Sequence, residues 1–512
     1  MEREKRMSRA DRVALLLSLL AVVIAYGVTD RIFERMPHIE DEMAYVWQAQ
    51  AIAGGRLTLP SPAHPKSFLV PFVVDYNGQR FGKYPPGWPA LLGLGVLLGI
   101  RSLVNPLLAG LGVWFTYRLG KRVASETVGL LASILTLSSP FFLMNSGSLL
   151  SHPFGLVLST VFALAWLDAW DGLRLNPWLP TLAGALCLGM LALTRPLTAV
   201  GVALPFALHG LVLMIRGNRA TRYRLVIFAL IVLALASLIF VWQFAVTGHP
   251  FLNPYTLWWE YDRVGFGPGV GRLEGGHTLY QARINTNFSL FVGAHDLFGW
   301  AQYSWIFLPF GLLAAFLRRC WKALIIGAIT PSLLIVYLAY WVGSWLFGPR
   351  YYYEALSSLT LLSALGIAWL AGWPTQPDES WRSYVGLRRA RPLAMTALLS
   401  FLLSVSLLVY SPMRLESMRG LYGVTRARLE PFLRPEAQQL TPALVIVHQE
   451  KWTEYGALLE LQNPWLDTPF IFVMSRGPQV DTQAAAAYPD RTVIHYYPSE
   501  PSVFYVEPRP TQ

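Results

Sequence analysis

The sequence has few charged residues and only two cysteines. Charged side chains make up 14% of its 512 residues, whereas about a quarter is usual in a soluble globular protein. Apolar residues make up 54%, and the mean hydropathy is +0.41. Cys187 and Cys320 cannot build a disulfide framework or a four-cysteine zinc site. The composition therefore excludes a soluble multidomain protein and a small domain held together by disulfides.

Phosphate-binding and nucleic-acid-binding signatures are also missing. The glycine-rich stretch Gly265–Gly276 contains neither GxGxxG nor GxxxxGK[ST], so a mobile outer loop is the better interpretation. The net charge of +11 arises from 41 basic and 30 acidic residues. Much of that excess lies in short loops between apolar runs, where it reports orientation in a membrane. We therefore expect no nucleic-acid partner.

Long apolar runs, each near the roughly 20 residues that cross a bilayer, predict about 11 transmembrane helices. No small-residue cleavage site follows the first run, so we expect a retained helix after the basic segment Met1–Arg12 rather than a signal peptide. The short, glycine-containing run Leu91–Leu98 is interpreted as an interfacial or re-entrant helix, with a thin span as the alternative. The predicted spans are Val13–Val28, Leu103–Leu119, Val128–Leu143, Phe154–Trp170, Leu179–Leu193, Thr198–Ile215, Val226–Val246, Tyr303–Leu317, Ala323–Trp341, Tyr353–Trp373 and Leu393–Val409.

The basic clusters between these runs set the orientation. If Leu91–Leu98 does not cross, every clear cluster lies on the cytoplasmic side, as the positive-inside rule requires. We therefore expect a multi-pass protein of a plasma or inner membrane with a cytoplasmic N-terminus. The loops 29–86 and 248–300 and the C-terminal region then lie outside. The clusters are Lys121-Arg122, Arg216–Arg224, Arg318–Lys322 and Arg382–Arg391.

The chain changes character after residue 410. Residues 411–512 are polar and contain prolines, and their apolar runs are short, as in β-strands. We predict an all-α polytopic transmembrane domain over 1–410, including the outer loop 29–86, and a small extracytoplasmic α/β domain over 411–512. The predicted strands are Ala443–Val447, Phe470–Val473, Thr492–Tyr497 and Ser502–Val506.

Three consecutive acids, Glu40-Asp41-Glu42, follow the first predicted span. The apolar and aromatic residues after them predict an amphipathic helix at the membrane surface. Such carboxylates could act as a general base toward a hydroxyl or bind a divalent cation. The alternative is an ordinary helix start, where acids interact favourably with the helix dipole. The pattern alone does not decide between the two.

Cations stand beside aromatic residues in two outer segments. In Lys83-Tyr84-Pro85-Pro86 the lysine could pair with a lipid phosphate, or it could be an ordinary snorkelling lysine in an aromatic belt. In Gly348-Pro349-Arg350-Tyr351 the arginine has the planar fork that suits phosphate. Arg195 is a second outer-face arginine in this topology. Either arginine could instead pair with an acid in the outer loops.

Together these segments resemble the GT-C glycosyltransferases. More narrowly, they resemble the family 39-type enzymes, which include protein O-mannosyltransferases and the lipid A aminoarabinose transferase. The resemblance rests on Asp41-Glu42 followed by Tyr45, on Lys83–Pro86 and on Gly348–Tyr351, with a topology that matches along roughly residues 1–410. It implies a glycosyltransferase that moves a hexosyl or pentosyl group from a polyprenyl-phosphate donor. The acceptor would be a hydroxyl of a protein, lipid or glycan at the outer face of the membrane.

The resemblance also implies roles for particular residues. Asp41 would be the catalytic carboxylate, with Glu42 its neighbour, while Lys83 and Arg350 would hold the donor phosphate. The remaining aromatic positions, Tyr84 and Tyr351, would flank the pocket.

Two features of the family have no clear counterpart in this sequence. Some members carry a second acid between their third and fourth spans, but the loop Asn145–His152 contains none, and His152 is the substitute considered. Some members also hold a metal, for which His38, Glu42 and His277 are candidate ligands of a divalent cation. No spacing signature fixes such a site, and no other cofactor is implied.

The alternative hypothesis is a transporter or flippase of lipid-linked sugars. It would share the spans and the phosphate-binding cations. Transporters usually carry ionisable residues near the bilayer midplane and often show internal repeats. Here the spans are nearly free of acids, and no repeat is evident. A receptor or scaffold would not need acids and cations on one face, so glycosyl transfer is the favoured hypothesis.

Overall fold

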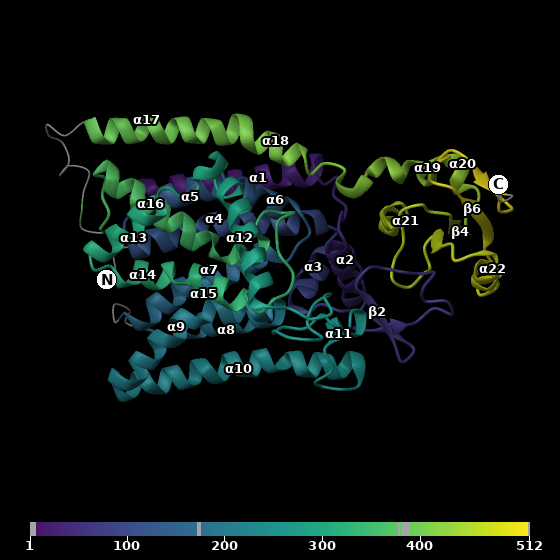
Figure 1. The fold of residues 1–512 in the computed structure, drawn as a ribbon, viewed down its shortest axis with the longest axis horizontal. Helices are drawn as coiled ribbons and strands as arrows, with labels where there is room; N and C mark the ends of the chain where they lie inside the picture. Colours follow the sequence, from purple (N-terminus) through teal and green to yellow (C-terminus); the bar gives the residue numbers. More distant parts are fainter. Residues whose placement is uncertain (1–6, 172–175, 377–378, 380–389, 510–512) are drawn as a thin grey trace.

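The computed structural model describes residues 7–171, 176–376, 379 and 390–509. Apolar helices lie side by side along the long axis of the molecule, and an α/β region lies at one end, beyond α2 (Glu40–Ala53) (Figure 1). The other main helices are α1 (Arg9–Arg31), α3 (Gly87–Leu97), α4 (Val104–Val123), α5 (Glu126–Leu137), α6 (Pro140–Gly147), α7 (His152–Trp170), α8 (Trp178–Thr194), α9 (Pro196–Arg216), α10 (Arg219–Thr247), α11 (Pro254–Trp258), α12 (Leu279–Asp296), α13 (Leu308–Leu317), α14 (Trp321–Gly327), α15 (Ile329–Tyr337), α16 (Leu356–Ala371) and α17 (Ala390–Val405).

Six helices in the described part of the chain are long and apolar enough to cross a membrane, and counting two bent pairs as spans raises the number to eight. Each bent pair, α5 with α6 and α12 with α13, turns sharply at a short break. Three shorter apolar segments accompany them. The protein is thus an integral membrane protein, but the predicted count of about 11 spans is not confirmed. The short helix α3 covers the run that we interpreted as interfacial.

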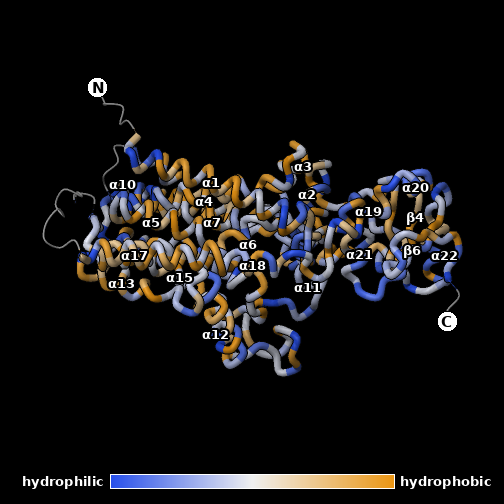
Figure 2. Tube along the Cα trace, turned by 90° about the horizontal axis from the view of Figure 1, so that it is seen from above, coloured by the Kyte–Doolittle hydropathy of each residue, from blue (hydrophilic) through white to orange (hydrophobic). Residues whose placement is uncertain are grey.

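Packing within the helical body follows the rules of membrane proteins. Small residues of α1, among them Ala14, Ser18 and Ala21, are buried, and Gly110 of α4 approaches the backbone at Ser18 so closely that a Cβ would clash there. Small residues permit such close backbone approach between membrane helices. By contrast, α10 exposes a row of large apolar side chains, including Leu233. Figure 2 shows this predominance of hydrophobic residues over the helical body.

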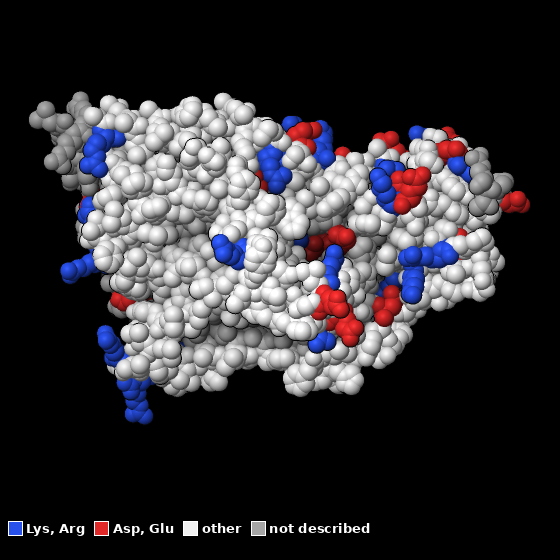
Figure 3. Space-filling view, viewed as in Figure 1, with Lys and Arg blue, Asp and Glu red and all other residues white. Residues whose placement is uncertain are grey.

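On the face drawn in Figure 3, a band across the helical body is nearly free of charged side chains. On the face drawn in Figure 3, Lys and Arg lie at the end far from the α/β region, whereas acids and bases are mixed at the opposite end and over the α/β region. A nearly charge-free band separates them. The predicted cytoplasmic cluster Arg382–Arg391 lies outside the described residues, apart from its last two positions.

Two small sheets accompany the helices. A three-stranded antiparallel sheet, in the order β1-β3-β2, is formed by β1 (Leu59–Pro60), β2 (Val73–Tyr76) and β3 (Gln79–Gly82). The C-terminal sheet has the order β5-β4-β6-β7, with the first three strands parallel. Its strands are β4 (Ala443–Val447), β5 (Phe470–Met474), β6 (Thr492–Tyr496) and β7 (Phe504–Tyr505). All four predicted strand segments are therefore present: the first has the predicted bounds, and the ends of the others differ by at most two residues.

The loop 248–300 contains more structure than we predicted. Its second half forms α12, which the hydropathy pattern missed because polar residues such as Gln281, Arg283 and Asn285 interrupt the apolar ones. The glycine-rich stretch 265–276 lies between α11 and α12, and several of its glycines have positive φ. An isolated bridge joins Val264 to Tyr340, so this loop contacts the segment after α15.

Candidate active site

The acidic triplet forms the first turn of α2, and its members differ in their surroundings. Glu42 is 1% exposed. Its carboxylate accepts hydrogen bonds from the backbone N–H groups of His38 (2.8 Å), Ile39 (3.3 Å) and Leu149 (2.7 Å). Burial raises the pKa of Glu42 to about 6, although these hydrogen bonds oppose the rise. Glu42 thus caps α2 and joins it to the loop after α6.

Asp41 instead directs its carboxylate toward a hydroxyl and a cation. The Tyr84 hydroxyl donates to one oxygen at 2.6 Å, and Nη2 of Arg350 lies 3.5 Å from the other. The side chain of Asp41 is 22% exposed. Burial acts to raise its pKa, but the Arg350 charge, the Tyr84 hydrogen bond and the charge of Lys83 outweigh burial and lower it. Asp41 is therefore held as a carboxylate.

A hairpin presents Lys83 and Tyr84 to this carboxylate. Strands β2 and β3 are joined through Asn77-Gly78, both with positive φ, as a two-residue hairpin turn requires. Gln48 of α2 then donates to the Tyr84 carbonyl at 2.8 Å. The hairpin end is thereby fixed against the helix that carries Asp41.

Lys83 is almost fully buried and is already paired. Its ammonium lies 3.1 Å from Asp262, a residue of the loop 248–300. Aromatic rings surround it, with Nζ 3.7 Å from the ring centre of Phe72, 4.7 Å from that of Tyr255 and 5.0 Å from that of Trp259. Burial lowers the pKa of Lys83, against the opposing charges of Asp262 and Asp41. Such a cage of rings, which favours cations electrostatically, partly offsets the desolvation of the ammonium.

Arg350, which is far from Asp41 in the sequence, lies close to its carboxylate in the fold. It begins the 3₁₀ helix η3 (Arg350–Ala355), two residues after Gly348, whose φ of +71° places it in the left-handed region. Its guanidinium lies 5.7 Å from the ring centre of Tyr351, and Nη1 is buried without a hydrogen-bond partner in the described residues. A buried unpaired donor is unfavourable unless a further acceptor is supplied.

Arg195 and His152 belong to a second polar cluster. Arg195 lies 3.0 Å from Glu354, which is fully buried, and its other nitrogens lie within 3.5 Å of Ser151, His152 and Tyr337. Tyr45 is 3.4 Å from Ser151 and so lies between the two clusters. The sequence therefore predicted members of both clusters, which are adjacent but distinct.

Two acids of these clusters were missed by the sequence reasoning. Asp262 pairs with Lys83, and Glu354 pairs with Arg195. One feature of the sequence could have indicated each acid: it stands among apolar and aromatic residues, where an ionisable side chain needs a partner. The identity of that partner required the fold.

The candidate metal ligands do not converge. His277 is 2.9 Å from the Leu338 carbonyl and stacks on Phe266, while His38 hydrogen-bonds to the Met36 carbonyl. Glu42 is engaged by three backbone N–H groups. Among the residues that the structure describes, no three His, Cys, Asp or Glu side chains form a group that could hold a metal ion.

Comparison with known proteins identifies the fold. No family model matches the chain, and no curated protein matches it by sequence. Among solved structures, it is similar to ArnT from Cupriavidus metallidurans, the lipid A aminoarabinose transferase, bound to undecaprenyl phosphate. The TM-score is 0.58 at 14% identity, over 95% of this chain and 90% of that chain. The apo state of the same protein gives the same values.

A second similar structure is the Archaeoglobus fulgidus oligosaccharyltransferase in complex with Zn and sulfate. The TM-score is 0.52 at 14% identity, over 87% of this chain and 61% of that chain. Both proteins are GT-C glycosyltransferases, and this chain has their fold.

Proposed function

From the GT-C fold and the cluster around Asp41, we propose that the protein transfers a sugar from a polyprenyl-phosphate donor to an acceptor hydroxyl. The observation that carries this proposal is the convergence of one ionised carboxylate with two cations, Lys83 and Arg350, from distant parts of the chain. The likeness to a protein solved with undecaprenyl phosphate supports the donor class. The sugar is a hexosyl or pentosyl group, and the acceptor is a protein, lipid or glycan.

In the proposed reaction Lys83 and Arg350 bind the donor phosphate. The free Nη1 of Arg350 supplies a donor for a phosphate oxygen. Asp41 accepts the proton of the acceptor hydroxyl, whose oxygen attacks the anomeric carbon. The bond between that carbon and the phosphate oxygen breaks, and polyprenyl phosphate departs with the electron pair. A single displacement of this kind inverts the anomeric configuration.

Binding of the donor would also change the pKa of Asp41, the proposed base. The cations that would bind the phosphate are the same charges that lower the pKa of Asp41. A bound phosphate offsets their charge, so the pKa of Asp41 rises when the donor is present. Asp41 thereby becomes a stronger base in the complex that needs one. Tyr84 and Tyr351 flank the phosphate site in this arrangement.

We also propose that the site faces the outer leaflet, with the N-terminus in the cytoplasm and residues 411–512 as an extracytoplasmic domain beside the membrane domain 1–410. The basic end of the helical body in Figure 3 supports this orientation, because positive charge is retained on the cytoplasmic side. Residues 248–300 would help to shape the acceptor site, since Asp262 already contacts Lys83.

The proposal is tested by incubating the purified protein with a panel of polyprenyl-phosphate sugars and candidate acceptors. Release of polyprenyl phosphate, dependent on both donor and acceptor, is the expected result. The same preparation in sealed vesicles distinguishes the transport alternative. Movement of an intact lipid-linked sugar across the bilayer, without release of polyprenyl phosphate, would contradict glycosyl transfer.

A further inference from the structure

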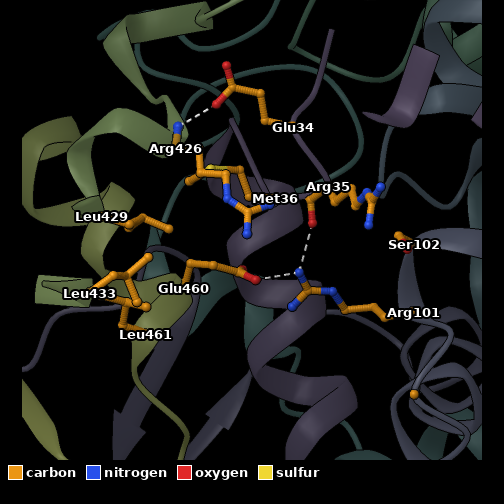
Figure 4. Close-up of a pocket in the computed structure, with 11 residues that line it drawn as sticks. Glu34, Arg35, Met36, Arg101, Ser102, Arg426, Leu429, Leu433, Glu460 and Leu461 are labelled. Atoms are coloured by element: carbon orange, nitrogen blue, oxygen red, sulfur yellow. Dashed lines mark hydrogen bonds and ion pairs between the residues drawn. The ribbon is translucent and has the colours of Figure 1, made fainter. Parts of the chain in front are cut away.

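A pocket of about 360 Å³ lies between the helical body and the C-terminal region, apart from the Asp41 cluster. The segment after α1 and the connection between α3 and α4 form one wall, and residues before and within the C-terminal sheet region form the other. Figure 4 shows Arg101 and Arg426 reaching into it from opposite sides, with leucines gathered beside Arg426. Neither Asp41 nor Lys83 nor Arg350 lines it.

The pocket contains both an unpaired cation and an unpaired acceptor. Arg101 donates to Oε1 of Glu460 at 2.6 Å and to the Arg35 carbonyl at 2.9 Å. Oε2 of Glu460 is buried and has no hydrogen-bond partner in the described residues. The Arg426 backbone N–H donates to Glu34, while the side chain of Arg426 is exposed and its guanidinium has no ion-pair partner among the residues described. A ligand with one anionic group and one hydrogen-bond donor would pair with the exposed guanidinium and would satisfy the buried oxygen of Glu460.

The pocket opens beside surface suited to lipid. Leu429, Leu433 and Leu461 line its interior, and Leu433 is 52% exposed. Gly99 of the lining follows Leu97 and Leu98, which are 63% and 70% exposed at the end of the apolar helix α3. The same wall includes Glu34, three residues after the end of α1 at Arg31. Because α1 is a candidate span, this wall lies where α1 would leave the hydrocarbon core and meet the headgroups.

The backbone at this wall is held in an uncommon conformation. Glu34 and Arg35 are consecutive non-glycine residues with φ of +48° and +60°. Such left-handed residues are destabilising unless the surroundings require them, and they cluster at ligand sites. Here the conformation points the Arg35 carbonyl toward Arg101 and directs the Glu34 carboxylate toward the Arg426 backbone.

We propose that this pocket binds the headgroup of a phospholipid that carries both a phosphate and a hydrogen-bond donor. The phosphate pairs with the Arg426 and Arg101 guanidinium groups, whose planar donors match phosphate oxygens. An ammonium or hydroxyl of the headgroup donates to Oε2 of Glu460. The leucines contact the first part of the acyl chains. The bound lipid bridges the helical body and the C-terminal region, and this does not depend on the glycosyltransferase proposal.

The test is native mass spectrometry of the full-length protein with lipids that share acyl chains and differ in headgroup. Phosphatidylethanolamine and phosphatidylglycerol should be retained in preference to phosphatidylcholine, whose headgroup has no donor. Arg426→Ala should weaken retention of the first two by about tenfold, the factor that corresponds to one charged hydrogen bond. Arg428→Ala is the matched control, because Arg428 lies on the same short turn and does not line the pocket.

A second variant and a competitor complete the test. Glu460→Gln should reduce the preference for phosphatidylethanolamine over phosphatidylcholine. Equal retention in Arg426→Ala and the parent protein, or no preference among headgroups, would overturn the proposal. Displacement of the lipid by an equal concentration of inorganic phosphate would show an anion site without lipid recognition and would also overturn it. Because the measurement uses no donor sugar, absence of glycosyl transfer would leave its outcome unaffected.

Discussion

Two arginine–carboxylate pairs meet at the short helix η3, and they differ in burial. Arg350 at its start lies 3.5 Å from Asp41, and the two side chains are 15% and 22% exposed. Glu354, four residues later, lies 3.0 Å from Arg195, with side-chain exposures of 0% and 11%. Gly155 is packed so closely against the Glu354 carboxylate that a Cβ would clash there. The first pair retains access and an unpaired donor, whereas the second is enclosed.

The difference in burial indicates that an arginine–carboxylate pair can have a structural role or a substrate-binding role. An enclosed pair contributes little net stability, but removing one partner leaves a buried charge uncompensated. An accessible pair can exchange its partner for a substrate group. We therefore expect changes at Asp41 to act on turnover and changes at Glu354 to act on folding.

The largest expected effect is that of Asp41→Asn on turnover. Loss of a general base reduces rates by about 10² to 10⁴, so release of polyprenyl phosphate from the donor should fall by this factor. The unfolding temperature in detergent should stay within a few degrees of that of the parent. A fully active Asp41→Asn protein would remove Asp41 from the proposed mechanism.

Glu354→Ala should instead destabilise the protein by about 3–5 kcal/mol, because Arg195 is left buried without its counterion. Denaturant unfolding of the detergent-solubilised protein measures this. Glu416→Ala is the control, since Glu416 and Arg419 form a surface pair that is 61% and 53% exposed, and such pairs contribute about 0–1 kcal/mol. If the two variants had equal free energies of unfolding, the enclosed Arg195–Glu354 pair would be no more important for stability than the surface pair.

Arg350→Ala should weaken binding of the donor by about tenfold or more, since a charged hydrogen bond contributes about 1.5–3 kcal/mol. The dissociation constant of polyprenyl phosphate, measured by calorimetry, is the readout. Arg263→Ala serves for comparison, because Arg263 is exposed and, among the described residues, its side chain hydrogen-bonds to the nearby Glu260 carbonyl. Unchanged affinity in Arg350→Ala would exclude the arginine from the phosphate site.

The buried Glu42, next to Asp41 in the sequence, gives the stability of the protein a pH dependence. Its pKa is raised from 4.5 to about 6 in the folded protein, so folding favours the protonated form. The resulting stability is complete below pH 4.5 and is lost as the pH rises through about 6, by about 2 kcal/mol in total. Unfolding measured across this window should show the loss. Glu42→Gln should flatten that slope, and an unchanged slope would assign it to another group.

The smallest effect concerns the partner of Lys83. A donor phosphate must compete with Asp262 for the ammonium, so Asp262→Asn should tighten donor binding by a few-fold at most. A hydrogen bond to a charged group contributes about 1 kcal/mol more than one to a neutral amide, and this difference corresponds to a change of a few-fold in affinity. Titration with polyprenyl phosphate detects it. Weaker binding in Asp262→Asn would mean that Asp262 positions Lys83 rather than competing for it.

The sequence predicted much of the arrangement because its strongest signals are local. Apolar runs located the helices, and the short apolar segments located the C-terminal strands. The break between α5 and α6 was not predicted, since Ser139-Pro140 restarts a helix within a continuous apolar run. The order of Asp41, Lys83 and Arg350 indicated a shared face, but the pairing of Lys83 with Asp262 depends on a fold that brings the loop 248–300 over the hairpin.

The length of α10 has a consequence for any assay. Its apolar part, Leu225–Val246, is about 33 Å long at 1.5 Å per residue, slightly more than the hydrocarbon core of about 30 Å. The helix α10 ends at Thr247 and is capped by Gly248, and the chain then passes through α11 to Asp262. A change in bilayer thickness alters the tilt of such a helix and therefore moves the anchor of the Asp262 loop. Acyl-chain length in the reconstituted membrane should therefore affect the position of Asp262 beside Lys83 in the proposed site.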